Sequence, residues 1–508
     1  MLTAHAMIVA GNCGYKQILV VQFSFLEVCH NFTMRKMVGF VSILTIAACG
    51  YGVADLCDVV PGLFTFKPLE NLAHPYPSIK ATEEAPPSLS SSKDAPMPDS
   101  AKVQEIIDTL SDASAIGGGD RLGMYVVDAQ TGAELGAHNQ SVGKVPASTM
   151  KVVTSYAALS SLGADHRFTT RALLSGQNLY LVGGGDILLG ADSGDSKHLV
   201  GHAGIADLAH AAAEKLAASK IDSVKVFLDN SRYSEDKYGP GVHEDVIYTL
   251  PSSPIAVGYE GDPFEAQHAV DRVLDTFVDH LRAAGVTVET AGVQTAPKDA
   301  QDIAHVDSAS VRAIADFTLL HSDNALADTL QHEIAVASGK IGSFETGSAA
   351  VTEQLQTQGF DLSGVSITDG SGLSPHNRLT PKLLTQILRA VWTCDSSAEK
   401  ENTKENTQGE ESDDVKVCPA TQIGAGMPFA GLDGTLKKRF TNSSATGRVH
   451  AKTGNLTGVR TLAGYLYTAQ GRPLVFAILV NTEHPGSEEF DNDVLPAIDD
   501  AVNALASL

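Results

Sequence analysis

The sequence predicts an α+β fold in which a larger domain carries a smaller inserted α/β domain. Pro146 to Gly163 holds apolar residues at helical spacing, with a proline at its start and a glycine at its end. Residues 448–468 alternate and are rich in Val, Thr, Leu and Tyr, which indicates a strand followed by a hairpin partner. Between these two regions, residues 178–190 and 223–241 combine strand-like segments with Gly-rich turns, which predicts the insertion.

Length and charge restrict the classes of protein. A chain of 508 residues is too long for one compact core and should contain two or more domains. The content of 43% hydrophobic and 19% charged residues is typical of an ordinary globular protein. Sixty acidic against thirty-six basic residues give a net charge of −24, which repels phosphate backbones and argues against nucleic acid as a partner.

The N-terminal hundred residues differ from the rest of the chain. Residues 1–33 show no recognisable organisation and are interpreted as an N-terminal extension. Residues 34–56 set Arg35 and Lys36 before an uncharged apolar run of about 17 residues, a length between those of a secretory signal and a membrane anchor. Residues 57–101 are predicted to be a linker, because the stretch from Leu69 to Ala101 is rich in Pro, Ser and Ala and poor in large apolar residues.

A basic and apolar N-terminal segment, then a linker, then a globular region is the layout of an enzyme held outside the cytoplasmic membrane. The chain is therefore expected to be extracytoplasmic, in a bacterial cell envelope, and either secreted or attached to the cytoplasmic membrane through its N-terminal segment. Cys394 and Cys418 flank a charged segment that reads as a surface loop, which a disulfide can close in an exported protein. Because the sequence contains no CxxC or HExxH, neither a metal site nor a cofactor is expected.

A lysine stands out in the predicted helix. Lys151 follows Ser148 by one turn on the same helical face, so its amine can reach the serine hydroxyl. A serine needs a base to become a good nucleophile, and a lysine can serve where desolvation lowers its pKa. The first-turn position also lets the backbone N–H of Ser148 point toward developing negative charge. The alternative is a lysine on a half-buried helix whose amine reaches out to solvent.

The Ser-x-x-Lys spacing alone is weak evidence, because the chain contains four other copies. These begin at Ser90, Ser141, Ser234 and Ser397. Each lies in linker, turn or charged-loop composition without a following apolar helical stripe. The context therefore has to distinguish the copy at Ser148 from the others.

Two downstream motifs provide this context. Ser322-Asp323-Asn324 is the only Ser-x-Asn of the chain, and the apolar residues on both sides predict a turn between two helices. Lys452-Thr453-Gly454 is the only Lys-Thr-Gly, and it lies on the predicted strand. Each motif alone has an ordinary structural explanation, as a helix cap or a strand end.

The three motifs in this order resemble the signature of the penicillin-recognising serine enzymes, which include penicillin-binding proteins and serine β-lactamases. The resemblance implies an antiparallel sheet with helices on both faces and a helical lobe. The catalytic domain is then expected in residues 102–168 and 303–508, with the inserted domain in residues 169–302. The separation of 174 positions from Ser148 to Ser322 is more than a helical lobe alone needs, which agrees with an insertion.

The motifs also suggest chemical roles. Ser322 can pass a proton toward the leaving amine, and Asn324 can bond the substrate amide. Lys452 and Thr453 can hold a carboxylate by charge and hydroxyl. A cation at Lys452 also helps to keep Lys151 neutral.

The last two residues of the predicted site are expected to act through the backbone. Gly454 is expected to let the substrate backbone lie close against the strand. The N–H of Asn455 is placed to be a second oxyanion donor beside the N–H of Ser148. The candidate catalytic residues are thus Ser148, Lys151, Ser322 and Lys452, and the candidate substrate-binding residues are Asn324, Thr453, Gly454 and Asn455.

Further segments narrow the resemblance to one family. "YLVGGGDILL", "VFLDNSRYS" and "DGSGLSPHNRLTP" resemble segments of the D-alanyl-D-alanine carboxypeptidases and endopeptidases of peptidase family S13, the penicillin-binding protein 4 type. The resemblance runs from about Lys102 to the C-terminus. It implies removal of the terminal D-Ala from peptidoglycan stem peptides or cleavage of cross-bridges, through an acyl-enzyme on Ser148, and acylation by β-lactams. In "DGSGLS" we expect a Gly-shaped loop near the cleft, with Asp369 and Ser371 behind the reacting residues.

The sequence leaves two alternative functions open and departs from the pattern of the S13 family at one place. A β-lactamase or esterase of the same fold is the nearest alternative, but no Glu-x-x-x-Asn element, typical of class A β-lactamases, lies between Ser322 and Lys452. A non-catalytic wall-binding or β-lactam-sensing protein is the other alternative, and it typically lacks the serine or a lysine. The departure is the stretch from Asp229 to Ser322, which is too short for the whole β-rich module of many family members.

Overall fold

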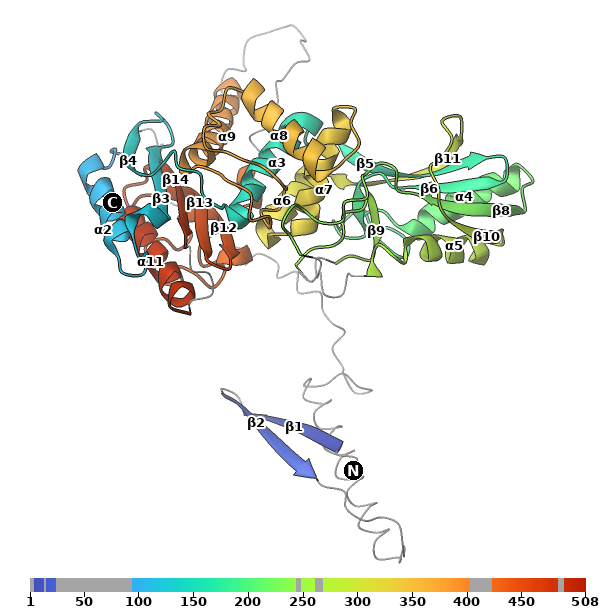
Figure 1. Ribbon diagram of the computed structural model, residues 1–508, viewed down its shortest axis with the longest axis horizontal. Helices are drawn as coiled ribbons and strands as arrows, with labels where there is room; N and C mark the ends of the chain where they lie inside the picture. Colours follow the sequence, from blue (N-terminus) through green and yellow to red (C-terminus); the bar gives the residue numbers. More distant parts are fainter. Residues whose placement is uncertain are drawn as a thin grey trace, which may run out of the picture. The chain divides into compact units, whose positions relative to one another are not determined.

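The computed structural model describes residues 4–12, 15–23, 94–243, 248–260, 268–402, 423–482 and 488–508 (Figure 1). The chain divides into two units, Met1–Pro86 and Pro87–Leu508. In the first unit, strand β1 (Ala4–Asn12) pairs antiparallel with β2 (Tyr15–Phe23), where the sequence analysis expected no organisation. Both strands contain consecutive Val, Ile or Leu residues, which favour a hairpin.

The predicted signal or anchor at 34–56 lies outside the described residues, as does most of the predicted linker at 57–101. Among the residues that the structure does describe, no helix is both long enough and apolar enough to cross a membrane. The last residues of the predicted linker belong to helix α2, which begins at Ser100. The Asp99 side chain accepts a hydrogen bond of 2.9 Å from the N–H of Ala101, which explains why the helix starts there.

An antiparallel sheet forms the first layer of the second unit. Its five strands lie in the order β12, β13, β14, β3, β4. They are β3 (Leu122–Asp128), β4 (Glu134–His138), β12 (Val449–Leu456), β13 (Val459–Tyr467) and β14 (Pro473–Asn481). The hairpin predicted in residues 448–468 is therefore β12 and β13, and β12 is the edge strand.

Helices cover both faces of this sheet. Helices α2 (Ser100–Asp112) and α11 (Glu488–Ser507) pack with one set of apolar strand residues, which includes Met124 and Phe476. Helix α9 (Pro381–Asn402) contacts the sheet through another set, which includes Val475 and Ala477. The fold class implied by the resemblance, an antiparallel sheet between helices, is thus confirmed.

The helical lobe stands beside this sheet and carries two of the three motifs. It consists of α3 (Met150–Leu162), α6 (Val311–His321), α7 (Asn324–Ala337) and α8 (Phe344–Thr357). A short helix, α10 (Ile423–Gly426), packs against α6. The turn predicted around Ser322 is the connection between α6 and α7. Figure 1 shows the lobe between the antiparallel sheet and a second sheet.

The second sheet is mixed, with strand order β10, β8, β6, β5, β11. Its strands are β5 (Arg167–Ser175), β6 (Asn178–Val182), β8 (Ser223–Asp229), β10 (Thr287–Val293) and β11 (Gln301–Ser310). Helices α4 (Ile205–Ala218) and α5 (Val273–Ala283) pack on its apolar residues, and β7 (Asp186–Leu189) pairs with β9 (Ile255–Val257). The expected boundaries of the inserted domain, at residues 169 and 302, would divide strands β5 and β11, which pair with each other along most of their lengths.

Helix α9 continues further than the sequence suggested. The segment after Cys394 was expected to be a loop, yet α9 extends to Asn402. The sequence of its last turns includes Ala398, Glu399 and Lys400, residue types of high intrinsic helix propensity. Cys418 lies outside the described residues, so the expected disulfide stays a prediction.

One buried ion pair is expected to matter for the stability of this fold. Arg472 donates to both carboxylate oxygens of Asp128, at 2.5 and 2.9 Å, and the two side chains are 7% and 0% exposed. Arg472→Met leaves a buried carboxylate unpaired and should destabilise the protein by about 3–5 kcal/mol. Urea denaturation measures the loss. Lys382→Met, which removes an exposed pair with Asp361, is the control, and equal losses in both variants would contradict the prediction.

Candidate active site

Ser148 lies in a tight turn that leads into α3. The turn is the 3₁₀ helix η2 (Ala147–Thr149), which Pro146 precedes, and α3 ends at Gly163 with a positive φ of 87°. The start and stop residues read from the sequence are therefore confirmed. Ala147 has an unusual positive φ of 46°, a strained conformation for a residue with a side chain. Ser148 is half-buried at this turn.

The amine of Lys151 has three oxygen neighbours and no contact with solvent. The side chain is 0% exposed, and Nζ lies 2.9 Å from Ser148 Oγ, 2.6 Å from Asn324 Oδ1 and 2.6 Å from the carbonyl oxygen of Ser371. A neutral amine has two hydrogens and one lone pair. The amide and carbonyl oxygens accept the two hydrogens, so the lone pair is left for the proton of Ser148. The geometry thus suits a Ser-Lys pair of nucleophile and base.

Burial lowers the pKa of Lys151 to about 8, against the opposing charges of Asp328, Asp369 and Asp323, which raise it. Burial also lowers the pKa of Lys452 well below its usual value, and the nearby Lys151 lowers it further. The two amines therefore repel each other when both are charged. The expected cation at Lys452 stays a prediction, and an anion bound beside Lys452 would raise its pKa again.

The Ser322 turn brings the second motif to the same place. Ser322 has a left-handed φ of 61°, and Asp323 caps α7 by accepting from the N–H of Leu326 at 2.9 Å. Tyr259 donates to the other oxygen of Asp323 at 2.6 Å. Asp323 thus fixes the turn, while its neighbours Ser322 and Asn324 are only half-buried.

The third motif meets the second through Lys452. This side chain is 0% exposed, and its Nζ donates to Ser322 Oγ at 2.9 Å and to the carbonyl oxygen of Thr453 at 2.8 Å. Asn324 Nδ2 donates to the carbonyl oxygen of Tyr248 at 2.7 Å, while its Oδ1 faces Lys151. A bond from Asn324 to a substrate amide would therefore use the remaining hydrogen of Nδ2.

The edge of β12 is open where the motif lies. Upstream, the outer edge is occupied, since the N–H of Ala451 donates to the carbonyl oxygen of Pro428 at 3.0 Å. Alternate N–H groups of a strand point to the same side, so the N–H of Asn455 points to this edge as well. Asn455 is exposed. An extended peptide can add to such an edge as a further strand.

The structure gives a packing reason for glycine at 454. A Cβ on Gly454 would lie 2.1 Å from Thr461 Oγ1 and 2.8 Å from the carbonyl oxygen of Pro146. Glycine is therefore required there for η2 to lie against β12. The contact places Ser148 beside the Lys-Thr-Gly strand, and the expected room for substrate at Gly454 stays a prediction.

The "DGSGLS" loop supports the site from behind, as expected. Asp369 accepts hydrogen bonds from the N–H groups of Gly372 and Ser374, at 2.8 and 2.6 Å. Gly372 has a φ of 87°, and a Cβ there would lie 1.9 Å from the carbonyl oxygen of Ala147. The loop therefore presses directly on the turn that carries the nucleophile, and only glycine fits at this point.

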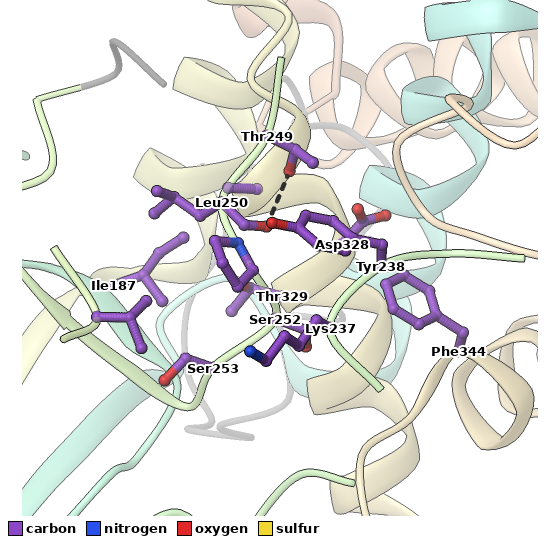
Figure 2. A pocket seen from close by; sticks show the side chains of 13 residues that line it. Ile187, Lys237, Tyr238, Thr249, Leu250, Ser252, Ser253, Asp328, Thr329 and Phe344 are labelled. Carbon is purple, nitrogen blue, oxygen red and sulfur yellow. Dashed lines mark hydrogen bonds between the residues drawn. The ribbon is translucent and has the colours of Figure 1, made fainter. Parts of the chain in front are cut away.

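Sequence reasoning missed Asp328, which lies on α7. Its Oδ1 accepts from the N–H groups of Gly370 and Ser371, at 3.0 and 2.8 Å, and so holds the carbonyl of Ser371 toward Lys151. A cavity of about 10 Å³ lies beside Asp328, between Tyr238, Thr249 and other side chains (Figure 2). It has room for about one water molecule and is not a substrate pocket. Helical spacing after Asn324, which puts Asp328 one turn later on the same face, is the only sequence signal for it.

Every residue of the predicted site thus lies on one of three adjoining elements, η2–α3, the Ser322 turn and β12. Hydrogen bonds connect Ser148, Lys151 and Asn324, and a second set connects Ser322, Lys452 and Thr453. In the part of the chain that the structure describes, no group of three His, Cys, Asp or Glu side chains could hold a metal ion. This arrangement is that of a serine enzyme with a lysine base.

Comparison with known proteins identifies the family. The model of the D-Ala-D-Ala carboxypeptidase 3 (S13) family matches residues 102–262, 257–404 and 416–506, so the chain belongs to this family of serine peptidases. A carboxypeptidase of Mycobacterium tuberculosis is 31% identical over 380 residues, which cover 72% of this chain and 77% of that protein. Carboxypeptidase DacB of Mycolicibacterium smegmatis is 32% identical over 377 residues, with 71% and 76% covered.

A solved structure has the same fold. Penicillin binding protein 4 from Haemophilus influenzae superposes with a TM-score of 0.62 at 19% identity, covering 81% of this chain and all of that one. The same protein in complex with a β-lactam gives a TM-score of 0.56 at 21% identity, covering 80% and 98% of the two chains. The family model thus confirms the family expected from the sequence motifs, and the solved structure confirms the fold.

Proposed function

We propose that the protein is a serine D-alanyl-D-alanine carboxypeptidase that acts on peptidoglycan stem peptides through an acyl-enzyme. The observation that carries the proposal is the contact of the buried Lys151 amine with Ser148 Oγ at 2.9 Å, in a chain of the S13 family. A base that can take the serine proton is what this chemistry needs first. The relatives named carboxypeptidases support the same reaction class.

The reaction begins with attack of Ser148 Oγ on the carbonyl carbon of the penultimate D-Ala, while Lys151 Nζ takes the hydroxyl proton. The oxygen of that carbonyl becomes negative and accepts from the N–H groups of Ser148 and Asn455. Ser322 passes a proton to the nitrogen of the departing D-Ala, which breaks the peptide bond and leaves the acyl group on Ser148. Water then hydrolyses this ester and restores the serine.

The remaining motif residues orient the substrate. Lys452 and Thr453 bind the carboxylate of the terminal D-Ala, and Asn324 binds the amide that precedes the cleaved bond. A β-lactam places a strained amide in the same position, so acylation by β-lactams follows from the same steps. The β-lactam complex of penicillin binding protein 4, which has the same fold, supports this part of the proposal.

We also propose that the protein lies outside the cytoplasm, either secreted or attached to the cytoplasmic membrane, as the sequence predicts. The S13 family acts on peptidoglycan, which places its reaction outside the cytoplasm. Residues 34–56 then serve as the signal or anchor, and the mixed sheet, from β5 to β11, forms the inserted domain within the catalytic one.

Two turnover measurements test the reaction. We expect the purified protein to release D-Ala from a stem pentapeptide and to turn over the chromogenic cephalosporin nitrocefin slowly, because its acyl-enzyme persists. Rapid nitrocefin hydrolysis without D-Ala release would instead identify a β-lactamase. Absence of both activities, with no covalent labelling by penicillin, would favour a non-catalytic wall-binding protein.

A further inference from the structure

One hydroxyl at the site belongs to none of the three motifs. Thr435 Oγ1 lies 2.8 Å from Thr453 Oγ1, so the two threonines form a hydrogen-bonded pair. Thr453 is buried, with 4% of its surface exposed, whereas Thr435 is exposed. Thr435 thus lies between the carboxylate-binding threonine of the proposed function and solvent.

The turn that carries Thr435 is well anchored. It is the 3₁₀ helix η5 (Gly434–Leu436), which contacts both β12 and α6. Leu436 is 0% exposed, and a Cβ on Gly434 would lie 2.7 Å from the carbonyl oxygen of Leu320. The side chain of Asp433 accepts from the N–H of Phe429 at 2.7 Å, which closes the preceding loop. The position of Thr435 is therefore set by packing and does not depend on a loose loop.

The hydroxyls of Thr435 and Thr453 and the amine of Lys452 can together donate two further hydrogen bonds to a ligand. Two hydroxyls share one hydrogen bond, so one O–H of the pair remains to donate, whichever threonine is the donor between them. A charged Lys452 amine has three hydrogens, and Ser322 Oγ and the carbonyl of Thr453 accept two of them. One O–H and one N–H thus remain, which matches the two oxygens of a carboxylate.

We propose that Thr435 is a further specificity-determining residue, which acts with Thr453 to bind the free carboxylate at the C-terminus of the substrate. The proposal rests on the carboxypeptidase function above and extends it to a residue outside the three motifs. Because Thr453 Oγ1 donates to Thr435 Oγ1, the O–H that is left for the carboxylate is that of Thr435, and a substitution that removes this hydroxyl removes the donor. The loss then affects ligands that carry the carboxylate and spares those that do not.

The test compares one ligand with and without its carboxylate. The full-length protein is acylated with benzylpenicillin and with benzylpenicillin methyl ester, and the second-order rate constants are measured for the parent, Thr435→Val and Thr435→Ser. A hydrogen bond to a charged group is worth enough to predict a loss of about tenfold or more with the free acid in Thr435→Val. The methyl ester should react at the parental rate, and Thr435→Ser should restore the free-acid rate because it keeps the hydroxyl.

The alternatives give different results. Equal losses for acid and ester in Thr435→Val would mean that the residue only supports the structure, and unchanged rates for both would also overturn the proposal. A failure of Thr435→Ser to restore the free-acid rate would show that the hydroxyl is not what matters. If the parent protein reacted with neither compound, the proposed function itself would fail, which is distinct from all these outcomes.

Discussion

Ser148→Ala is expected to abolish covalent labelling by fluorescent penicillin and to stop D-Ala release. The substitution removes the only atom proposed to form the acyl-enzyme, Oγ of Ser148, and leaves the Lys151 amine without the proton that it accepts. The cavity it creates is small because Ser148 is half-buried, so the fold should persist. Mass spectrometry of the labelled parent protein should place the adduct on the peptide that contains Ser148.

The chain provides its own control for this variant. Ser141 begins another Ser-x-x-Lys sequence, but the Nζ of its lysine, Lys144, donates to the carbonyl oxygen of Asp120. Ser141→Ala should therefore label as strongly as the parent. Labelling of Ser148→Ala at the parental level would show that the nucleophile has been assigned to the wrong serine.

Local spacing explains why the three motifs could be read from the sequence. A serine and a lysine one turn apart lie on the same helical face wherever the helix forms, and the apolar stripe predicted that helix. Asp323 caps α7, so the turn between the apolar segments was also encoded locally. Only the resemblance placed Lys452 and Ser322 in one site, and no pattern predicted the hydrogen bond between these two residues, 130 positions apart.

Contacts made across the fold could not be read in the same way. Asp328 and Ser371 support Lys151 only because α7 and the "DGSGLS" loop are neighbours in space. Thr435 meets Thr453 through the anchored turn η5, and no spacing rule connects the two residues. The packing of Gly454 against Thr461 likewise depends on the pairing of β12 with β13, while its expected contact with substrate stays a prediction. The roles of these residues depend on tertiary packing, which the periodicity of the sequence does not reveal.

Lys151→Met is expected to lower the rate of acylation by benzylpenicillin by about 10²–10⁴-fold, the usual contribution of a general base. Methionine has a similar length and an apolar end, so it fits the buried position, but it takes no proton. Lys237→Met is the control, since Lys237 also ends a Ser-x-x-Lys sequence and is exposed. A loss of less than about tenfold in Lys151→Met would assign the base to another group.

The dependence of the rate on pH tests the same assignment without removing the lysine. Only the neutral amine can accept a proton, so the acylation rate should rise with pH and level off above the pKa of Lys151, about 8. Below that pKa the rate should fall about tenfold for each pH unit. The charged groups that face the amine are Asp328, Asp369 and Asp323, which raise its pKa, and Lys452, which repels it.

Asp328→Asn should move this profile in a defined direction. Removal of a negative charge destabilises the ammonium form of Lys151, so its pKa falls and the rise in rate shifts to lower pH. The Asn side-chain oxygen can still accept from the N–H groups of Gly370 and Ser371, which keeps the loop in place. Asp323→Asn should shift the profile in the same direction, because Asp323, the cap of α7, also raises the pKa of Lys151. No shift in either variant would mean that the titrating group lies away from both carboxylates, and Lys151 would then not be the base.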